Sequence, residues 1–428
     1  MFVELLTIGD ELCRGEIVNT NASWLAAQLW DLDLTVRWMT SCRDDAADMT
    51  QALRAAAGRA DLVLTSGGLG PTEDDLTVDV VAAAAGQGVV VDEPSRLRLE
   101  ARFPGRAAQV PNLLRQLRVP AAARVHGNPV GLAPCFELDL PGATGRPVPV
   151  LCLPGVPREI HGIFDGGVRA RLVELREGQG VAPRIARRIY RVFGRGESQI
   201  AVACAGVVDD QPGASIHYQV KFPETLVKIV VRDRELAAAG ARLEVIDGRL
   251  RAALGEFLYG TDEPALPEVV VGELLGAGLT VACAESCTGG MVGELLTRRP
   301  GASRAFRGGA IVYSNEEKSR QLGISPALLA DHGAVSEACV RAMASATQDR
   351  FDVDVAVAIS GIAGPDGGSA DKPVGTVWLA TATRAGQVNA QRIHWPGARD
   401  MVRTLAAWWA LTLVRQAAGT MAPAGGGV

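Results

Sequence analysis

The chain has 428 residues, of which 48% are hydrophobic and 21% are charged, and its formal net charge is −5. This length exceeds that of one ordinary domain, so we expect two or three. The negative charge and an aromatic content of only 5% give no support to nucleic-acid binding, and we expect no direct nucleic-acid partner. The eight cysteines include no CxxC pair, which argues against a zinc ribbon or a disulfide framework.

The sequence predicts neither a signal peptide nor a membrane span. The N-terminus enters an apolar run directly, without a basic region before it. The longest apolar run near the end, residues 405–414, is too short to cross a bilayer and predicts a buried helix. We therefore expect a cytoplasmic protein that has no contact with a membrane.

The first 170 residues alternate short apolar runs with helical patterns. The runs predict strands at residues 3–8, 35–40 and 61–65. The helical patterns cover residues 20–32, 46–57 and 76–85. Such alternation predicts an α/β domain with a parallel sheet.

Two loops at the ends of these strands combine acidic residues with glycines. Their notable residues are Asp10, Glu11, Gly67, Gly68, Gly70, Asp74 and Asp75. Ligands of open α/β sheets lie beyond the carboxyl ends of the strands. Glycines let the backbone approach a phosphate, and carboxylates bind hard cations. We favour a metal–phosphate site, although carboxylates that only cap helix N-termini are the alternative.

A small α+β module is predicted between two polar linkers, residues 174–184 and 261–267. Its strands are expected at residues 187–193, 215–219 and 226–232, and its helices at residues 197–204 and 236–254. Gly194 and Gly196 could form a clamp for a ligand, but a simple turn is the preferred interpretation.

Further along, Ser286 follows a predicted buried strand, residues 279–284, and precedes Gly289, Gly290 and a helix at residues 291–297. A strand-to-helix turn would lift the serine hydroxyl clear of the sheet. The free N–H groups at the helix start could then hold a developing oxyanion. The alternative is a helix-capping serine with glycines in a tight turn.

A base for this serine is predicted in the next strand–loop segment. Tyr313, Asn315 and Lys318 follow an apolar strand, whereas none of the five histidines lies in a suggestive motif. A buried, neutral lysine can activate a serine, with a tyrosine as proton shuttle. Cys287 is the rival nucleophile, but neighbouring residues on a turn point in different directions and no histidine is at hand to form its thiolate.

A glycine-rich loop at residues 360–375 follows another apolar strand, residues 353–359. Its backbone N–H groups and Lys372 suit an anionic substrate. Arg399, at the start of the final helix, is a second phosphate candidate. Strands at residues 375–383 and 388–394 lie between them.

Long motifs carry a resemblance to a known family. The segments AESCTGG (284–290), YSNEEK (313–318), HGAVSE (332–337) and SGIAGPDGGSADKPVG (360–375) resemble the C-terminal domain of the CinA family, a nicotinamide-nucleotide amidase. The segments GDEL (9–12), NTN (19–21), TSGGLGPTEDDLT (65–77) and LPGVPREI (153–160) resemble its N-terminal domain, which has the molybdopterin-binding-protein fold.

The resemblance implies hydrolysis of nicotinamide mononucleotide to nicotinate mononucleotide and ammonia, without a cofactor. Ser286 would be the nucleophile, assisted by Lys318 and Tyr313. The substrate-binding residues would be Thr288, Gly289, Gly290, Asn315, Gly364, Gly368, Lys372 and Arg399, with Gly67, Gly68 and Gly70 at the N-terminal site.

For the N-terminal domain the resemblance implies ADP-ribose pyrophosphatase activity, with a divalent metal held by Asp10, Glu11, Asp74 and Asp75. We expect an α/β protein with a molybdopterin-binding-like domain (1–173), an α+β module (184–260) and an amidase domain (266–418), and we expect a homodimer. The alternative is that the N-terminal domain only binds a nucleotide or a molybdopterin, in an accessory protein related to competence or DNA damage.

Overall fold

The computed structural model describes residues 1–105, 110–143, 145–178 and 184–421. The chain divides into two compact units, Met1–Ile185 and Ala186–Val428. Both units combine helices with sheets, so the predicted α/β class is confirmed. Within the described ranges, no helix has both the length and the apolar character that crossing a membrane requires.

A six-stranded sheet of order β2-β1-β3-β8-β7-β6 forms the centre of the N-terminal unit. Its strands are β1 (Phe2–Ile8), β2 (Thr35–Cys42), β3 (Leu62–Ser66), β6 (Arg124–His126), β7 (Cys135–Pro141) and β8 (Pro147–Leu153). Strands β2, β1, β3 and β8 are parallel, whereas β7 is antiparallel to both β8 and β6. The prediction of a parallel sheet is therefore wrong for β6 and β7. An apolar run indicates a strand but not its direction, and the short β7–β8 connection allows only a hairpin.

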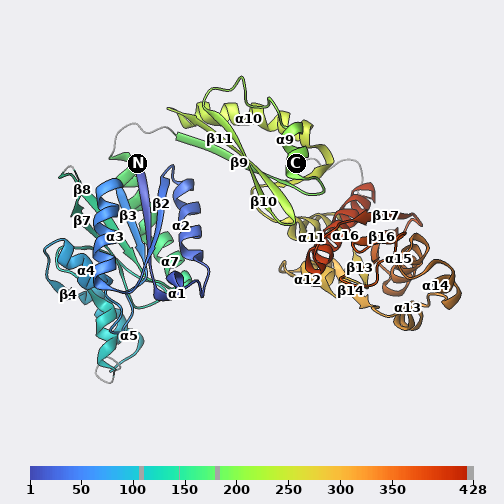
Figure 1. The fold of residues 1–428 in the computed structure, drawn as a ribbon, viewed down its shortest axis with the longest axis horizontal. Coiled ribbons are helices and arrows are strands. Elements are labelled where there is room, and N and C mark those ends of the chain that lie inside the picture. Colours follow the sequence, from blue (N-terminus) through green and yellow to red (C-terminus); the bar gives the residue numbers. More distant parts are fainter. Residues whose placement is uncertain (106–109, 144, 179–183, 422–428) are drawn as a thin grey trace. The chain divides into compact units, whose positions relative to one another are not determined.

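Helices cover both faces of this sheet (Figure 1). They are α1 (Asp10–Cys13), α2 (Thr20–Asp31), α3 (Ala46–Arg59), α4 (Thr77–Ala84), α5 (Glu93–Arg102), α7 (Pro157–Ile163) and α8 (Arg169–Glu177), with a 3-10 turn η1 (Pro111–Leu117) and a π-helical turn η2 (Phe164–Val168). A small second sheet pairs β4 (Val89–Val91) with β5 (Arg118–Pro120). The linker expected from residue 174 begins later, because α8 continues to Glu177, and residues 179–183 lie outside the described ranges.

Two apolar cores hold these layers together. Leu25 and Leu29 of α2 pack with Ile160 of α7 against one face of the sheet. Leu53 of α3 and Val81 of α4 pack against the other face. Because both faces of the central strands are covered, these strands are almost wholly apolar, as parallel strands between two helix layers generally are.

The C-terminal unit begins with a four-stranded sheet of order β10-β11-β9-β12. Its elements are β9 (Arg184–Val192), α9 (Glu197–Ala203), β10 (Ala214–Lys221), β11 (Glu224–Asp233), α10 (Leu236–Leu254), a 3-10 turn η3 (Gly255–Phe257) and β12 (Leu258–Thr261). Gly194 lies between β9 and α9 at a φ of 89°, which agrees with the preferred turn. Ring contacts from Phe193 and Tyr259 to Trp408, at 5.4 and 6.1 Å, join this module to the rest of the unit.

A five-stranded sheet of order β14-β13-β15-β16-β17 forms the remainder of the unit. Its strands are β13 (Val281–Glu285), β14 (Phe306–Ile311), β15 (Val355–Gly361), β16 (Thr376–Thr383) and β17 (Val388–His394). Strand β13 is parallel to both of its neighbours, and β15, β16 and β17 are successively antiparallel. The carboxyl end of β13 therefore opens between the same ends of β14 and β15.

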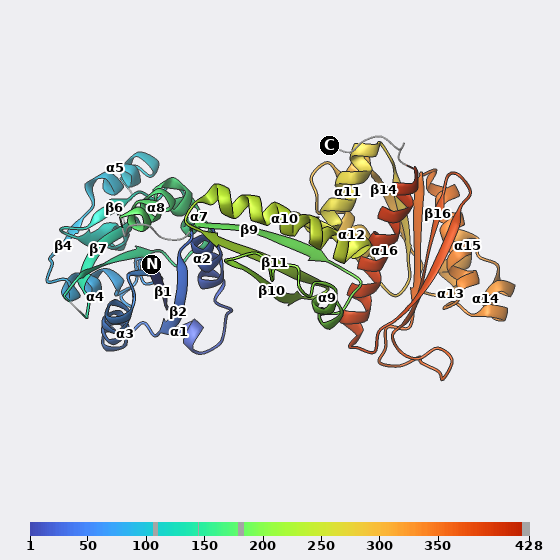
Figure 2. The ribbon, with the colours of Figure 1, turned by 90° about the horizontal axis from the view of Figure 1, so that it is seen from above.

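Helices also form two layers around this second sheet (Figure 2). They are α11 (Leu266–Ala277), α12 (Met291–Thr297), α13 (Asn315–Leu322), α14 (Pro326–His332), α15 (Glu337–Phe351) and α16 (Arg399–Met421), with a 3-10 turn η4 (Ala302–Arg304). Helices α11, α12 and α16 share one apolar core with the sheet. Helices α13, α14 and α15 share another. The apolar run at residues 405–414 is thus part of a buried helix, as predicted.

Candidate functional site

Ser286 lies immediately beyond the carboxyl end of β13, on the turn that leads to α12. Its main-chain N–H donates to the carbonyl oxygen of Ile359 on β15 (3.1 Å), which ties the turn to the neighbouring strand. Only 7% of the residue is exposed. The turn closes through Gly289 and Gly290, whose φ angles of 60° and 101° favour glycine. The serine is therefore held rigidly at the edge of the sheet.

Lys318 of α13 points at this serine. Its Nζ lies 3.0 Å from the Oγ of Ser286, and it also donates to the carbonyl oxygens of Val312 (2.9 Å) and Tyr313 (3.3 Å). The side chain is 1% exposed and forms no ion pair in the described residues. Burial lowers the pKa of Lys318 below its usual range, because a charged ammonium loses its hydration there.

Glu285 accepts hydrogen bonds from main-chain N–H groups at the start of α12. Its buried carboxylate accepts hydrogen bonds from Gly290 (2.9 Å), Val292 (3.1 Å) and Gly293 (2.9 Å). The expectation that free N–H groups of this helix face an oxyanion is therefore wrong, because a neighbouring side chain already binds them. Capping of this kind satisfies donors that would otherwise lack a partner.

Arg403 of α16 fixes the same turn from another direction. Its guanidinium donates to the carbonyl oxygens of Cys287 (3.2 Å) and Thr288 (3.0 Å). Asp400 lies 3.5 Å from the guanidinium. The two residues after the nucleophile are thus bound by a cation located 115 or more residues further along the chain.

The hydroxyl of Tyr313 forms no hydrogen bond with Ser286 or Lys318 in the described residues. It accepts a hydrogen bond from Arg399 (2.9 Å), and the residue is 59% exposed. Arg399 also donates to the carbonyl oxygen of Gly364 (2.7 Å). The structure thus brings together three predicted residues, Tyr313, Gly364 and Arg399. Lys318 contacts this group through the main-chain oxygen of Tyr313.

The remaining predicted residues lie in different surroundings. Thr288 is fully buried, and its Oγ1 has no hydrogen-bond partner in the part of the chain that the structure describes. Asn315 lines an open cavity of about 700 Å³ between α13 and α14. Lys372 donates to the carbonyl oxygen of His332 (3.0 Å), and a Cβ at Gly368 would come within 2.9 Å of the Val374 nitrogen. Their substrate-binding roles stay predictions.

The rival nucleophile Cys287 is buried beside Ser286. It is 4% exposed, and burial raises the pKa of its thiol to about 12. A thiol that stays protonated at neutral pH is a poor nucleophile. The geometry therefore favours Ser286, whose oxygen faces an amine.

The N-terminal unit contains a second candidate site, a cavity of about 370 Å³ beyond the ends of β1, β3 and β8. It is lined by the predicted Gly67, Gly68 and Gly70. A Cβ at these positions would lie 2.2 Å from the Ile8 oxygen, 2.3 Å from Thr77 Oγ1 and 2.4 Å from Asp75 Oδ2, respectively. These glycines are therefore required by the close packing of the loop itself, before any ligand is considered.

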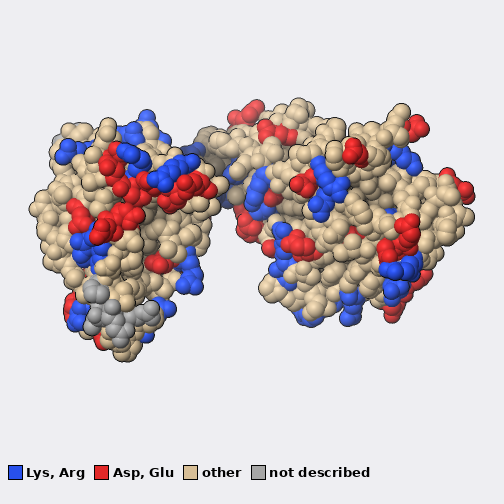
Figure 3. Space-filling view, turned by 60° about the horizontal axis from the view of Figure 1, so that its bottom comes forward, with Lys and Arg blue, Asp and Glu red and all other residues tan. Residues whose placement is uncertain are grey.

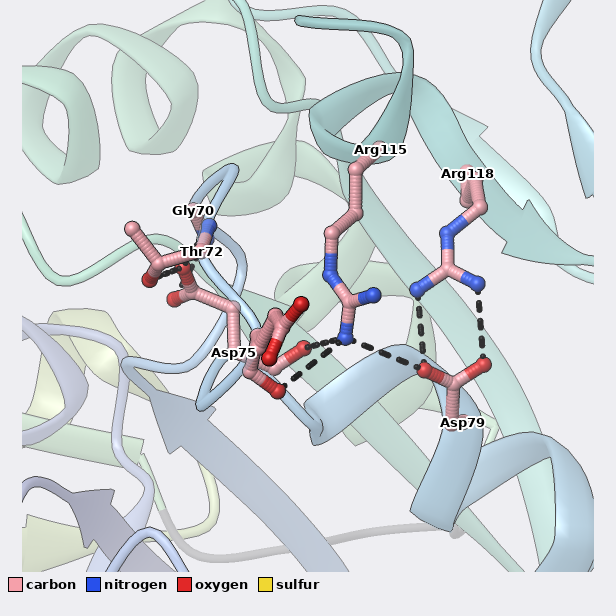
Figure 4. Close-up of polar contacts among 7 residues, drawn as sticks. Gly70, Thr72, Asp75, Asp79, Arg115 and Arg118 are labelled. Carbon is pink, nitrogen blue, oxygen red and sulfur yellow. Dashed lines mark hydrogen bonds and ion pairs between the residues drawn. The ribbon is translucent and has the colours of Figure 1, made fainter. Parts of the chain in front are cut away.

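The predicted carboxylates of this site have unequal roles. Asp75 accepts hydrogen bonds from the main-chain N–H groups of Gly70 (2.7 Å) and Thr72 (2.8 Å) and so closes the loop (Figure 4). Arg115 donates to the main-chain oxygens at the end of the same loop, and Arg118 pairs with Asp79 beside it. Asp10 pairs with Arg14 and does not line the cavity. Asp75 therefore has a structural role, but it binds N–H groups of the loop and does not cap a helix N-terminus as the alternative predicted.

The carboxylates that remain at the cavity are Glu11, Asp44, Asp74 and Glu159. Burial raises the pKa of Asp44, and the negative charges of Glu11 and Asp74 raise it further. In the described residues, however, no group of three or more His, Cys, Asp or Glu side chains is arranged to hold a metal ion. Of the four residues predicted to hold a metal, Glu11, Asp74 and Asp75 line the cavity and Asp10 does not, and their role as metal ligands stays a prediction.

Charged side chains of both signs are mixed over the face seen in Figure 3. On that face, acidic and basic side chains neighbour each other instead of forming one continuous basic band.

Glu285, Asp44 and Arg403 are among the residues of these sites that the sequence analysis did not predict. Glu285 precedes the serine in the AESCTGG motif, so its position was visible but its acceptor role was not. Asp44 lies on a loop without glycines, and only its place after strand β2 could have suggested it. Arg403 reaches the turn from a distant helix, and no local pattern indicates such a contact.

Three consecutive ranges of the chain match models of known protein families. Residues 4–173 match a family model described as a probable molybdopterin binding domain, residues 187–260 the KH domain of damage-inducible protein CinA, and residues 263–418 the CinA C-terminal domain. A CinA-like protein of Anaeromyxobacter dehalogenans is 43% identical over 97% of this chain and 100% of its own length. A putative competence-damage inducible protein of Symbiobacterium thermophilum is 40% identical over 97% of this chain and 98% of its own.

Solved structures of CinA proteins cover a smaller part of the chain. A CinA superfamily protein from Klebsiella pneumoniae is 35% identical over 36% of this chain and 96% of its own, with a TM-score of 0.35. A CinA protein from Thermoplasma acidophilum is 33% identical over 40% of this chain and 97% of its own, with a TM-score of 0.36. Full-length similarity to the curated relatives shows that the chain belongs to the family of CinA-like proteins.

Proposed function

We propose that the C-terminal site hydrolyses the carboxamide of nicotinamide mononucleotide, releasing ammonia and nicotinate mononucleotide. The observation that carries this proposal is the buried Lys318 Nζ, 3.0 Å from the Oγ of Ser286. The substrate follows from the resemblance of the surrounding motifs, and the chemistry follows from the geometry of the two side chains.

The three contacts of Lys318 suit a neutral amine. An ammonium has three N–H donors and no lone pair, whereas a neutral amine has two donors and one acceptor position. The two carbonyl oxygens of Val312 and Tyr313 can take both N–H groups of the amine. Its lone pair is then left for the O–H of Ser286, which is the arrangement that a general base needs.

The reaction proceeds in two halves. Lys318 removes the hydroxyl proton of Ser286 as the serine oxygen attacks the carboxamide carbon. The resulting lysine ammonium gives this proton to the departing nitrogen, so that ammonia leaves and an acyl-serine ester remains. A water molecule, deprotonated by the neutral lysine, then hydrolyses the ester and restores the serine.

The test is to incubate the purified protein with nicotinamide mononucleotide and measure ammonia together with nicotinate mononucleotide. Nicotinamide riboside, which lacks the phosphate, is the matched control for substrate recognition. Acid quenching followed by peptide mass spectrometry should find the acyl group on the peptide that contains Ser286. Absence of ammonia release, or an acyl group on another residue, would contradict the proposal.

A second candidate function concerns the N-terminal cavity, and we propose that it cleaves the pyrophosphate of ADP-ribose. The supporting observation is a cavity lined by a glycine loop together with Glu11, Asp44 and Asp74. Oxygen donors of this kind suit a hard divalent cation, which would neutralise a bound diphosphate. Because the side chains do not converge on one point, no catalytic step is assigned to a metal.

Incubation with ADP-ribose, with and without a divalent cation and a chelator, tests this second proposal. Release of AMP and ribose 5-phosphate only in the presence of the cation is the expected result. Binding of ADP-ribose without cleavage would instead favour the alternative of a nucleotide-binding module.

A further inference from the structure

The turn after Ser286 contains four main-chain N–H groups, those of residues 287–290. Gly289 donates to the carbonyl oxygen of Ser286 (3.1 Å), and Gly290 donates to the carboxylate of Glu285 (2.9 Å). The N–H groups of Cys287 and Thr288 donate to no oxygen in the described residues. Two main-chain donors directly after the candidate nucleophile therefore lack a protein acceptor in the part of the chain that the structure describes.

The same two residues have their carbonyl groups bound. Arg403 donates to the oxygens of Cys287 (3.2 Å) and Thr288 (3.0 Å). The carbonyl of Cys287 and the N–H of Thr288 belong to one planar peptide unit, so a guanidinium on the oxygen also fixes the direction of the N–H. A cation on the oxygen withdraws electron density from the peptide, which makes its N–H a stronger donor.

The side chain of Thr288 provides a second sign of unmet hydrogen-bonding capacity at this turn. The residue is fully buried, yet its Oγ1 has no partner among the described residues. Buried polar groups are almost always paired, so an unpaired one requires a reason. A bound polar species at the turn would supply the missing partner.

These observations lead to an inference that rests on the proposed amide hydrolysis. We propose that the main-chain N–H groups of Cys287 and Thr288 hold the oxyanion that forms when Ser286 attacks the carboxamide. Arg403 is the positioning residue that orients the N–H of Thr288, because it binds the carbonyl of the same peptide unit. Glu285 has a separate task, because it binds the N–H groups of α12 and thereby anchors the turn without contributing a donor.

Labelling of Ser286 by a fluorophosphonate tests the donors without depending on the natural substrate. In this reaction the serine oxygen bonds to phosphorus, fluoride leaves and the phosphoryl oxygen takes the position of the oxyanion. Arg403→Gln should slow labelling about 10-fold or more and lower kcat by a similar factor, with KM changed about twofold at most. Arg403→Lys should recover part of the rate, because an ammonium can still reach one carbonyl.

Arg415→Gln is the matched control, since Arg415 lies on the same helix but pairs with Glu273 at 2.9 Å. It should label at the wild-type rate. A second variant replaces the residue at position 288 by its α-hydroxy acid counterpart, so that an ester removes one N–H and leaves every side chain in place. Slower labelling of this ester protein, with an unchanged melting temperature, is the expected result.

The outcomes separate this inference from the proposed function. Rapid labelling of the wild type without ammonia release from nicotinamide mononucleotide would refute the substrate and leave the donors supported. Unchanged labelling of both Arg403→Gln and the ester protein would overturn the inference, whatever the amidase rate. A wild-type protein that releases ammonia but resists the probe would overturn the inference and leave the proposed function standing.

Discussion

The two candidate sites use a carboxylate in the same way but are left with different chemistry. In the N-terminal loop, Asp75 accepts the N–H groups of Gly70 and Thr72, and in the C-terminal turn Glu285 accepts three N–H groups of α12. In both sites, therefore, a carboxylate beside a glycine-rich turn accepts hydrogen bonds from the main chain. The remaining polar groups then define each site: a serine facing a buried lysine in one unit, and acidic side chains around a cavity in the other.

The sharpest way to separate the two sites is Ser286→Ala. Loss of the nucleophile should lower ammonia release from nicotinamide mononucleotide by about 10³-fold or more. Cleavage of ADP-ribose, measured on the same preparation, should be unchanged because the N-terminal unit has its own cavity. Loss of both activities in a folded protein would show that the comparison between independent sites is mistaken.

Lys318→Met should lower kcat of the amidase by about 10²- to 10³-fold, since methionine fills the buried space but cannot accept a proton. In the wild type, burial lowers the pKa of Lys318, so the neutral amine is populated below the ordinary lysine range. The rate should rise with pH as the ammonium loses its proton, and level off above that pKa. A flat pH profile, or an active Lys318→Met protein, would exclude lysine as the base.

The third prediction compares neighbouring carboxylates in the N-terminal loop. Asp75→Asn should lower the free energy of unfolding of this unit by about 1–3 kcal/mol, because an amide oxygen is a weaker acceptor for the loop N–H groups. Asp74→Asn should leave stability unchanged and weaken only cation-dependent cleavage. Urea denaturation followed by a cleavage assay distinguishes the two. Equal effects on stability would remove the distinction between loop-closing and cavity-facing carboxylates.

The smallest effect is expected for Cys287→Ala. The thiol is buried and its pKa is raised to about 12, so it takes no part in the reaction at neutral pH. The variant keeps the main-chain N–H of residue 287, and its amidase rate should stay within about twofold of wild type. Alkylating agents should react slowly with this thiol. If the variant is folded but inactive, Cys287 and not Ser286 would be the better candidate for the nucleophile.

The sequence predicted the elements better than the contacts between them. Helices α10 and α12 and strand β17 begin and end at the expected residues, because apolar periodicity and flanking turn residues are local signals. The antiparallel direction of β7 was missed, since strand direction depends on a connection and not on composition. The Ser286–Lys318 contact was predicted from two sequence motifs. The hydrogen bond from Arg403 to Thr288 joins residues 115 apart in the sequence, and no local pattern indicates it.

The hydrogen bonds from Arg403 to the turn after Ser286 have a consequence for folding during translation. Helix α16 follows every other helix and strand of its unit in chain order, and it carries Arg403. During translation, Thr288 therefore leaves the ribosome 115 residues before the arginine that fixes its carbonyl. A nascent chain can already contain the serine and the lysine in one growing fold while its turn is still unanchored. The synthesis of α16 is therefore coupled to the anchoring of this turn.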